Sequence, residues 1–155
     1  MYKLSIGPSK ESHQADIAVM MAGIASEYTE SIYGRKAMVP VPGSERYDWV
    51  ATINGTVAGT VSVIITTEGY AILKNMFVDK ACRGNAMGVA LGLLNTAISR
   101  ARVSRCARLL LGTMQQFAAA QRFYSKNRFS LVDERELPPS FPRNDVDTLF
   151  YDLAL

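Results

Sequence analysis

The chain has 155 residues, 48% hydrophobic and 20% charged, which is an ordinary globular composition with enough length for the core of one domain. Its formal net charge of +3 suits an anionic ligand but is too small to indicate nucleic-acid binding by itself. No apolar run approaches the ~18 residues of a membrane span and the N-terminus lacks the apolar segment of a signal peptide, so we expect a cytoplasmic protein with no membrane partner.

Few residues are available for metal or triad chemistry. Cys82 and Cys106 lack the spacing of a metal site, and we expect two reduced thiols. His13 is the single histidine, which nearly excludes His-based metal sites and a Ser-His-Asp triad. We therefore expect no metal site.

The first half of the chain predicts an antiparallel meander after one helix. Apolar residues alternate over 2–6, which is typical of a short strand, and recur at helical spacing over 14–33, which predicts an amphipathic helix in one piece or two. The Pro- and Gly-rich stretch 34–46 indicates a loop. Asn54-Gly55 separates two apolar runs and favours a type I′ hairpin. We expect three strands here, at 47–53, 56–66 and 70–79.

The second half alternates helices and strands. The three prolines of 137–145 exclude regular structure there. The order β, α, β-β-β, α, β, α, β, loop, β predicts an α/β (α+β) fold with a mixed sheet, antiparallel at first, and two β-α-β crossovers later. The elements expected are a helix after Arg83, a strand at 107–113, a helix at 115–127, a strand from Phe129, and a last strand at 146–155.

A run of small residues marks the turn between the strand ending near Val78 and the next helix. Arg83-Gly84 is followed by Ala86 and Gly88, although a glycine in a helix costs about 1 kcal/mol relative to alanine. A helix start presents free N–H groups and a favourable dipole to phosphate, and small side chains let a pyrophosphate reach the backbone. The alternative is a tight turn with close packing. The preceding meander disfavours the usual dinucleotide-binding βαβ unit.

With this turn in place, the chain resembles the GNAT family of N-acetyltransferases. The stretch LKNMFVDKACRGNAMGVAL is similar to the family's motif A, a strand with V-D-x-x-x-R-G-x-G-x-G and a helix, and LLLGTMQQFAAAQRFYSKNRF resembles motif B. The resemblance covers roughly residues 47–133. It implies the GNAT acyl-CoA N-acyltransferase fold, a mixed central sheet flanked by helices, in a single N-acetyltransferase domain over 1–155.

The resemblance implies a binding site for acetyl-CoA as acyl donor. Its pantetheine arm would bond to the strand backbone like an added strand, and its pyrophosphate would lie on the amides of residues 83–88. A backbone N–H near Phe77 would polarise the thioester carbonyl. The cofactor-binding residues implied are Met76, Phe77, Val78, Arg83, Gly84, Asn85, Ala86, Met87, Gly88, Val89 and Lys126.

The resemblance also implies the chemistry, in which an amine attacks the thioester directly. Tyr124 holds the family's tyrosine position and would protonate the leaving thiolate; the alternative is a half-buried core aromatic. Ile72 stands where many members carry a carboxylate base, so the base is open. The candidates are Glu27, Glu30, Glu68 or a water chain, and each glutamate has the alternative of a solvated surface carboxylate.

Three further positions depart from the family pattern. Ala86 replaces the middle glycine, which is tolerable if its φ is negative. Phe117 stands where many members carry an Asn that contacts the cofactor, so we expect no polar contact from it. Arg128 replaces the glycine before Phe129, so the helix must end on Asn127 or under strain.

Cationic side chains gather in two places. Arg122 and Lys126 lie four apart on the helix of motif B and face either the CoA phosphates or solvent. Four arginines at a helix end complement the helix dipole or, alternatively, bind nucleic acid: Arg100, Arg102, Arg105 and Arg108.

Loops 34–46 and 137–145 take positions that in the family shape the acceptor pocket.

These inferences predict an N-acetyltransferase that moves an acetyl group from acetyl-CoA to the amine of a small-molecule or amino-acid-like acceptor, as a monomer or homodimer. The alternative is an acyl-CoA-binding module with reduced or lost catalysis, which the isoleucine at position 72 motivates. A basic nucleic-acid-binding domain is the third hypothesis and rests on the arginines alone.

Overall fold

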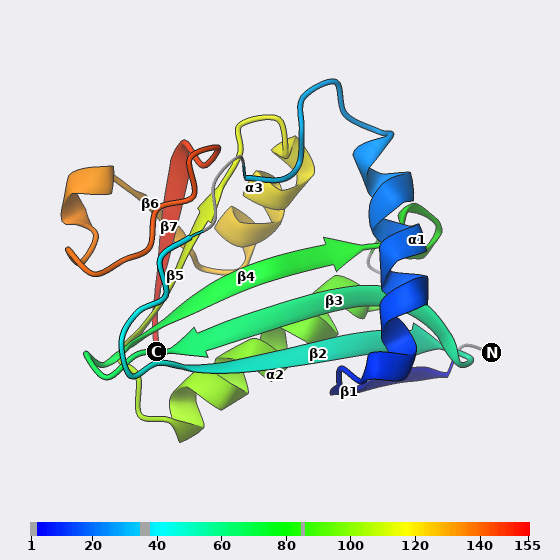
Figure 1. Cartoon of the computed structure of the whole chain (residues 1–155), viewed down its shortest axis with the longest axis horizontal. Helices are drawn as coiled ribbons and strands as arrows, with labels where there is room; N and C mark the ends of the chain where they lie inside the picture. Colours follow the sequence, from blue (N-terminus) through cyan, green and yellow to red (C-terminus); the bar gives the residue numbers. More distant parts are fainter. Residues whose placement is uncertain (1–2, 35–37, 85) are drawn as a thin grey trace.

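The structure, a computed structural model, describes residues 3–34, 38–84 and 86–155 and contains a seven-stranded mixed sheet with helices on both faces (Figure 1). The strand order is β1-β2-β3-β4-β5-β7-β6. The strands are β1 (Leu4–Pro8), β2 (Glu45–Ile53), β3 (Thr56–Ile65), β4 (Tyr70–Val78), β5 (Arg108–Thr113), β6 (Ser130–Val132) and β7 (Leu149–Ala154). The helices are α1 (Gln14–Ala25), α2 (Val89–Val103) and α3 (Ala118–Lys126), with short 3-10 turns η1 (Glu11–His13), η2 (Lys80–Cys82) and η3 (Glu134–Glu136). The predicted order of elements is confirmed.

Strands β1 to β4 form the antiparallel part of the sheet. The turn between β2 and β3 has positive φ at both central residues, 50° at Asn54 and 85° at Gly55, as a type I′ turn requires. Two tight turns thus place β2, β3 and β4 side by side without any long connection. The predicted hairpin is confirmed.

Two crossovers build the rest of the sheet. Helix α2 connects β4 to β5, which pair in parallel. Helix α3 leads from β5 to β6, and β7 then inserts between these two strands, antiparallel to both. Both predicted crossovers are confirmed, although the second skips one strand.

Helix α1 is shorter than its apolar pattern predicts. It ends at Ala25, where the Ser26 hydroxyl donates to the Gly23 carbonyl, and the chain continues in turns. Tyr28 and Ile32 still pack on the same hydrophobic cluster as the helix. The periodicity beyond residue 25 therefore reflects burial and not helix.

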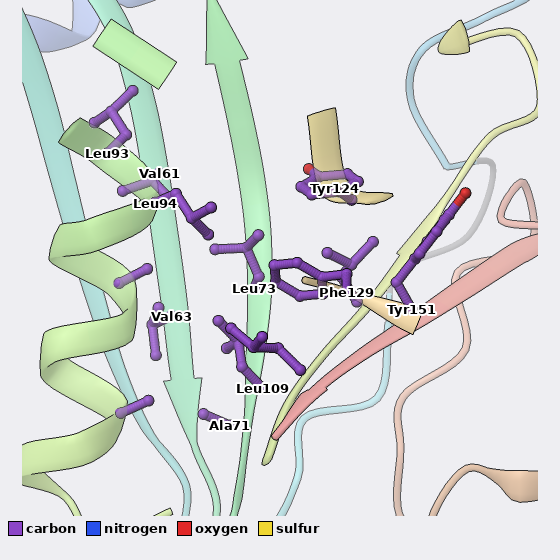
Figure 2. Close-up of a cluster of buried hydrophobic side chains, with 14 of the residues drawn as sticks. Val61, Val63, Ala71, Leu73, Leu93, Leu94, Leu109, Tyr124, Phe129 and Tyr151 are labelled. Atoms are coloured by element: carbon purple, nitrogen blue, oxygen red, sulfur yellow. The ribbon is translucent and has the colours of Figure 1, made fainter. Parts of the chain in front are cut away.

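The largest hydrophobic cluster fills the space between the sheet and α2 (Figure 2). Leu93 and Leu94 of α2 are at most 1% exposed and face the central strands. Val61 of β3 faces them from the sheet. Each fully buried side chain of this size contributes roughly 1.5–3 kcal/mol of transfer free energy. The cluster continues through Leu73 and Leu109 to aromatic side chains near α3: Tyr124, Phe129 and Tyr151.

Strands β4 and β5 separate after a short stretch of parallel pairing. Their pairing runs only from Tyr70 opposite Arg108 to Ile72 opposite Leu110, and Figure 1 shows the two strands diverging beyond it. A β-bulge accompanies the divergence, because the β3–β4 register shifts around Asn75, whose φ is 51°. The Thr60 hydroxyl donates to the Asn75 carbonyl at 2.8 Å and fixes the bulge. The second half of β4 therefore presents a backbone edge that no strand covers.

No helix of the described residues has the length and apolar character to cross a membrane. Cys82 and Cys106 are free thiols, as expected. Within the same residues the arginine group at the end of α2 is partly engaged inside the molecule. Arg100 lies 4.4 Å from the ring centre of Tyr47, and Arg108 pairs with Asp152 at 2.9 Å.

Candidate functional site

A cleft of about 540 Å³ lies where β4 and β5 diverge. Its sides are the end of β4, the start of α2, the end of α1 and helix α3. Most lining side chains are apolar, which suits the burial of a ligand's apolar arm, while a few polar groups lie at its ends. The lining residues are Ile24, Tyr28, Met76, Phe77, Val78, Arg83, Gly84, Gly88, Ala90, Leu91, Thr113, Phe117, Ala119, Ala120, Phe123, Tyr124 and Lys126.

The uncovered edge of β4 offers a backbone donor to this cleft. The Asp79 N–H donates to the Ala58 carbonyl across to β3 at 2.8 Å. Since neighbouring residues of a strand point their polar groups to opposite sides, the Val78 N–H faces away from β3. The Val78 carbonyl faces the same way, because it accepts from Arg83 Nε at 3.0 Å.

The turn into α2 has the open backbone that its small residues indicate. Gly84 and Gly88 have φ of 102° and 69°, and a Cβ on either would meet no atom within 4 Å. Asn85, also predicted in this site, lies outside the described residues. The φ of Ala86 depends on Asn85, so the expected tolerance of the Ala86 methyl group stays a prediction. The start of α2 therefore gives an anion room to approach backbone N–H groups.

Arg83 lines the cleft, but its guanidinium is already engaged. Nη1 and Nη2 donate to the two carboxylate oxygens of Glu27 at 2.5 and 2.9 Å. This hydrogen bonding lowers the pKa of Glu27, which makes Glu27 a weaker base than an unpaired glutamate, and its suggested role as the general base stays a prediction. The pair instead joins the turn after α1 to the end of β4.

Tyr124 is a buried aromatic that also lines the cleft, and its catalytic role stays a prediction. It is 6% exposed, its ring packs on Phe129 and Tyr151 with ring centres 5.4 and 5.8 Å away, and it also lines the cleft. Among the described residues its hydroxyl has no hydrogen-bond partner, and Figure 2 draws that hydroxyl on the side of β4. Burial, with smaller contributions from Asp147 and Tyr151, raises the pKa of Tyr124. The group is therefore a proton donor at neutral pH.

Some predicted binding residues have no side chain in the cleft. Val89, the first residue of α2, is fully buried in the core, and Met87, in the turn before α2, packs on that core. Neither they nor Ala86 line the cleft; only their backbone groups are available. Arg122 is exposed and does not line it either, whereas Lys126 does.

Sequence reasoning missed the aromatic wall of the cleft. Tyr28 and Phe117 pack edge to face with ring centres 5.0 Å apart, and Phe77 lies 6.2 Å from Phe117. Phe117 shapes the cleft as an apolar surface. The sequence signal was Phe117 itself, a large apolar side chain within the motif B segment.

The remaining suggestions for a base, Glu68, Glu30 or a water chain, stay predictions. Ile72 is 1% exposed beneath Val41 and Phe141, so the loops around those residues seal that part of the β4–β5 face. Glu68 lies in the turn before β4, and the strand advances six residues from Tyr70 to Met76, about 20 Å at ~3.3 Å per residue. Glu30 is exposed and does not line the cleft.

A carboxylate that sequence reasoning missed lies close to the point of divergence. Asp147 precedes β7, and its Oδ2 is so close to the Gly112 Cα that a Cβ there would lie 2.7 Å away. Burial, opposed by Lys74 and assisted by Asp145, raises the pKa of Asp147 to about 6. Burial likewise lowers the pKa of Lys74, while Asp147 opposes this. The only sequence signal was an aspartate within a segment read as a strand.

A second, polar cleft of about 410 Å³ lies between α1 and the face of β2, β3 and β4. Phe77 lines both clefts. Its floor carries a polar group on β2 and β3, in which the Ser62 hydroxyl donates to Asp48 and Arg46 Nε donates to the same carboxylate at 3.0 Å. These charges satisfy one another.

Comparison with known proteins places these features in a family. The chain matches the model of the acetyltransferase (GNAT) family over residues 21–129. It is 30% identical over 108 residues to the N-acetylaspartate synthetase of Danio rerio, a match that covers 68% of this chain. The chain spans only 38% of the length of that relative.

Solved structures repeat the architecture. An acetyltransferase of the GNAT family from Staphylococcus aureus Mu50 superposes with a TM-score of 0.82 at 25% identity, covering 99% of both chains. The N-acetylglutamate synthase of Neisseria gonorrhoeae, complexed with coenzyme A and N-acetylglutamate, superposes with a TM-score of 0.73 at 14% identity over 99% of this chain and 35% of that one. At this identity the second likeness concerns the fold.

Proposed function

The chain belongs to the GNAT acetyltransferase family, and on this premise we propose that it transfers the acetyl group of acetyl-CoA to the amine of a small, amino-acid-like acceptor. The observation that carries the proposal is the cleft at the divergence of β4 and β5, which joins an open strand edge, an open helix start and a protonated tyrosine. A CoA complex of the similar Neisseria structure supports the choice of acyl donor.

The residues present fit acetyl-CoA. The free edge of β4 at Met76 and Val78 suits the two amides of a pantetheine arm, which bond as an added strand would. The empty space above Gly84 and Gly88 suits a pyrophosphate, because no side chain keeps it from the backbone. Lys126 supplies a positive charge at the edge of the same cleft.

The chemistry assigned to this chain needs two groups at the thioester. The Val78 N–H, on the uncovered edge of β4, is suited to donate to the developing oxyanion. The Tyr124 hydroxyl donates a proton to the departing sulfur, for which its raised pKa keeps it in the protonated form. The acceptor nitrogen attacks directly, so the chain needs no nucleophile of its own.

The names of two similar proteins suggest which acceptors to test first. Their names refer to N-acetylaspartate and N-acetylglutamate, which are N-acetylated acidic amino acids. Because the match covers only 38% of the first and 35% of the second, these acceptors are starting points for a screen. Aspartate and glutamate accordingly head the amine panel.

The test compares Gly88→Glu with Gly88→Gln. Both side chains impose the same strain at a φ of 69°, and only the glutamate repels phosphate. We expect Gly88→Glu to weaken acetyl-CoA binding at least tenfold more than Gly88→Gln in calorimetry, and wild type to release CoA thiol in the presence of an amine. Unchanged affinity in a folded Gly88→Glu variant would place the phosphate site elsewhere.

A second candidate is an acyl-CoA-binding module without catalysis. It is favoured by Ile72, which is sealed beneath apolar loops where many family members carry a base. Wild-type chain that binds acetyl-CoA in calorimetry but releases no thiol with any amine of the panel would select this candidate.

A further inference from the structure

We propose that Asp147 is the general base that takes the proton of the acceptor amine, at the point where β4 and β5 separate. The assignment rests on the N-acetyltransferase function proposed above. It supplies the group that Ile72 lacks, from a different strand and a different loop.

The position of Asp147 follows from the end of the β4–β5 pairing. Ile72 opposite Leu110 is the last pair, and two residues further along the same face stand Lys74 on β4 and Gly112 on β5. The Asp147 carboxylate lies against Gly112, which has no Cβ to exclude it, and interacts electrostatically with Lys74. It therefore lies between the two diverging strands.

The backbone holds this carboxylate in place. The Asp147 N–H donates to the Asn144 carbonyl at 3.1 Å, and the next N–H, of Thr148, donates to the Thr113 carbonyl at 3.0 Å. Thr113 itself lines the acetyl-CoA cleft. The segment carrying the base is thus bonded to a residue of the donor site.

Acid and base lie on opposite faces of the sheet. Tyr124 packs with Leu73 and Leu111 in the cluster on the α2 face, whereas Gly112, beside Asp147, belongs to the other face with Leu110. Tyr124 lines the acetyl-CoA cleft and Asp147 does not, so the proposal puts the acceptor amine on the Asp147 side of the divergence and the thioester between the two groups. An arrangement of two titrating groups whose environments differ is typical of acid–base pairs.

The charged groups around Asp147 set its proton affinity. Lys74 faces it from β4, Asp145 from its own segment and Tyr124 from α3, and burial outweighs the attraction of Lys74. Its pKa of about 6 leaves most of it ionised at neutral pH while making it a stronger base than an exposed aspartate. Neither Glu27, paired to Arg83, nor Asp48, paired to Arg46 on β2, combines these properties.

In the proposed step one C–N bond forms and one C–S bond breaks. Asp147 takes one proton from the acceptor ammonium, the freed lone pair forms the N–C bond to the thioester carbonyl, and the C–S bond breaks. Sulfur receives the Tyr124 proton, and the second proton of the attacking nitrogen replaces it on Tyr124. The proton on Asp147 then passes to water.

The experiment uses the full chain and an alkyl amine from the panel that supports thiol release. We compare kcat/KM between pH 5 and 9 for wild type, Asp147→Asn, Asp147→Glu and the matched control Asp16→Asn. General base catalysis is typically worth about 10²–10⁴-fold, so Asp147→Asn should lose at least about 100-fold and the acid limb near pH 6. Asp147→Glu should recover part of the rate, and Asp16→Asn should stay within about threefold of wild type because Asp16 is exposed in the first turn of α1.

Two further measurements separate a base from a structural carboxylate. Hydroxylamine is neutral at pH 7 and has no ammonium proton to lose, so its deficit in Asp147→Asn should be at least about tenfold smaller. The second measurement is urea unfolding. The pKa of Asp147 is higher in the folded chain than in the unfolded chain, so the folded chain binds the proton first as pH falls. Ionised Asp147 therefore lowers the free energy of unfolding above pH 6. Asp147→Asn should therefore be more stable than wild type at pH 8, and the difference should vanish near pH 4.

Wild-type rates and an intact acid limb in folded Asp147→Asn would overturn the base assignment alone. Equal losses with both amines, together with lower stability at pH 8, would also overturn it and make Asp147 a support of the fold. If wild type binds acetyl-CoA but releases no thiol with any amine, the proposed function fails and the base assignment fails with it.

Discussion

At the scale of single residues, a side chain's partners decide its role more than its type does. Arg83 carries the charge that a phosphate site needs, yet both of its terminal nitrogens are bonded to Glu27 and its Nε to the Val78 carbonyl. A bidentate pair of this kind is stronger than a single contact and orients both partners. Arg83 accordingly positions the strand edge on which Val78 lies, and the backbone amides of the turn are the natural anion donors.

Tyr124→Phe is the test of the general acid. The change keeps the ring that packs on Phe129 and Tyr151 and removes only the hydroxyl. Since CoA thiolate is a moderate leaving group, kcat should fall at least about tenfold, with the acetyl-CoA KM nearly unchanged. The measurement is steady-state thiol release under conditions where chemistry limits the rate.

The control is Tyr151→Phe, which removes a hydroxyl from the neighbouring ring of the same cluster and should leave kcat within about threefold. Wild-type kcat in folded Tyr124→Phe would remove Tyr124 from the mechanism and leave it as a core aromatic.

The sequence could predict backbone sites better than side-chain sites. Gly84 and Gly88 predict an open turn because they have no side chain, and both have positive φ in the structure. Asp147 could not be found in this way, because its environment is made by Lys74 and Gly112, which are distant in the chain and meet only across the sheet. Residues whose role depends on such tertiary neighbours need the structure.

At the scale of elements, the functional geometry comes from a defect in the sheet. A regular β4 would pair with β5 along its length, but pairing stops at Ile72 and the bulge at Asn75 bends the remainder away. Hydrophobic patterning predicts that strand correctly, since patterning reports which face is buried and not whether an edge is covered. The pattern therefore could not predict the divergence of β4 and β5.

The end of α3 carries a local strain that can be relieved. Arg128 has a φ of 73°, a conformation that favours glycine, and the Phe129 N–H donates to the Tyr124 carbonyl at 3.1 Å to close the helix. Asn127 also caps the helix through its side chain, so both of the expected alternatives occur together. Arg128→Gly should raise the free energy of unfolding by about 1 kcal/mol.

Urea unfolding of Arg128→Gly and Arg122→Gly checks this expectation. Arg122 lies inside α3 and is exposed, so its replacement removes the same charge but should cost about 1 kcal/mol of helix stability. A loss of stability in Arg128→Gly as well would mean that the Arg128 side chain contributes more than its backbone strain costs.

At the scale of the whole molecule, the order of elements was predictable because its signals are local. The Asn54-Gly55 turn sets the β2–β3 hairpin, and a helix between successive strands, α2 and then α3, makes each of the two crossovers. What local signals could not give is how weakly the two halves of the sheet are joined. Only three residue pairs, from Tyr70–Arg108 to Ile72–Leu110, connect β1–β4 to β5–β7 directly.

This weak joint leads to a prediction about ligand-linked stability. A ligand that bonds to the free edge of β4 and packs on α3 bridges both halves, and it binds the folded chain only. At a free concentration 100 times its Kd, acetyl-CoA should add about 2.7 kcal/mol to the free energy of unfolding. At roughly 2–4 °C per kcal/mol for a chain of this size, Tm should rise by about 5–11 °C.

Thermal unfolding and hydrogen exchange together test the bridge. Exchange should slow at the amides of 76–78 and in α3, and the Tm rise should disappear in Gly88→Glu but persist in Gly88→Gln at saturating ligand. A Tm rise with protection confined to the start of α2 would mean that the phosphates bind while the arm stays outside the cleft. Since a thioester held outside the cleft reaches neither Tyr124 nor Asp147, such a chain would bind acetyl-CoA without transferring its acetyl group.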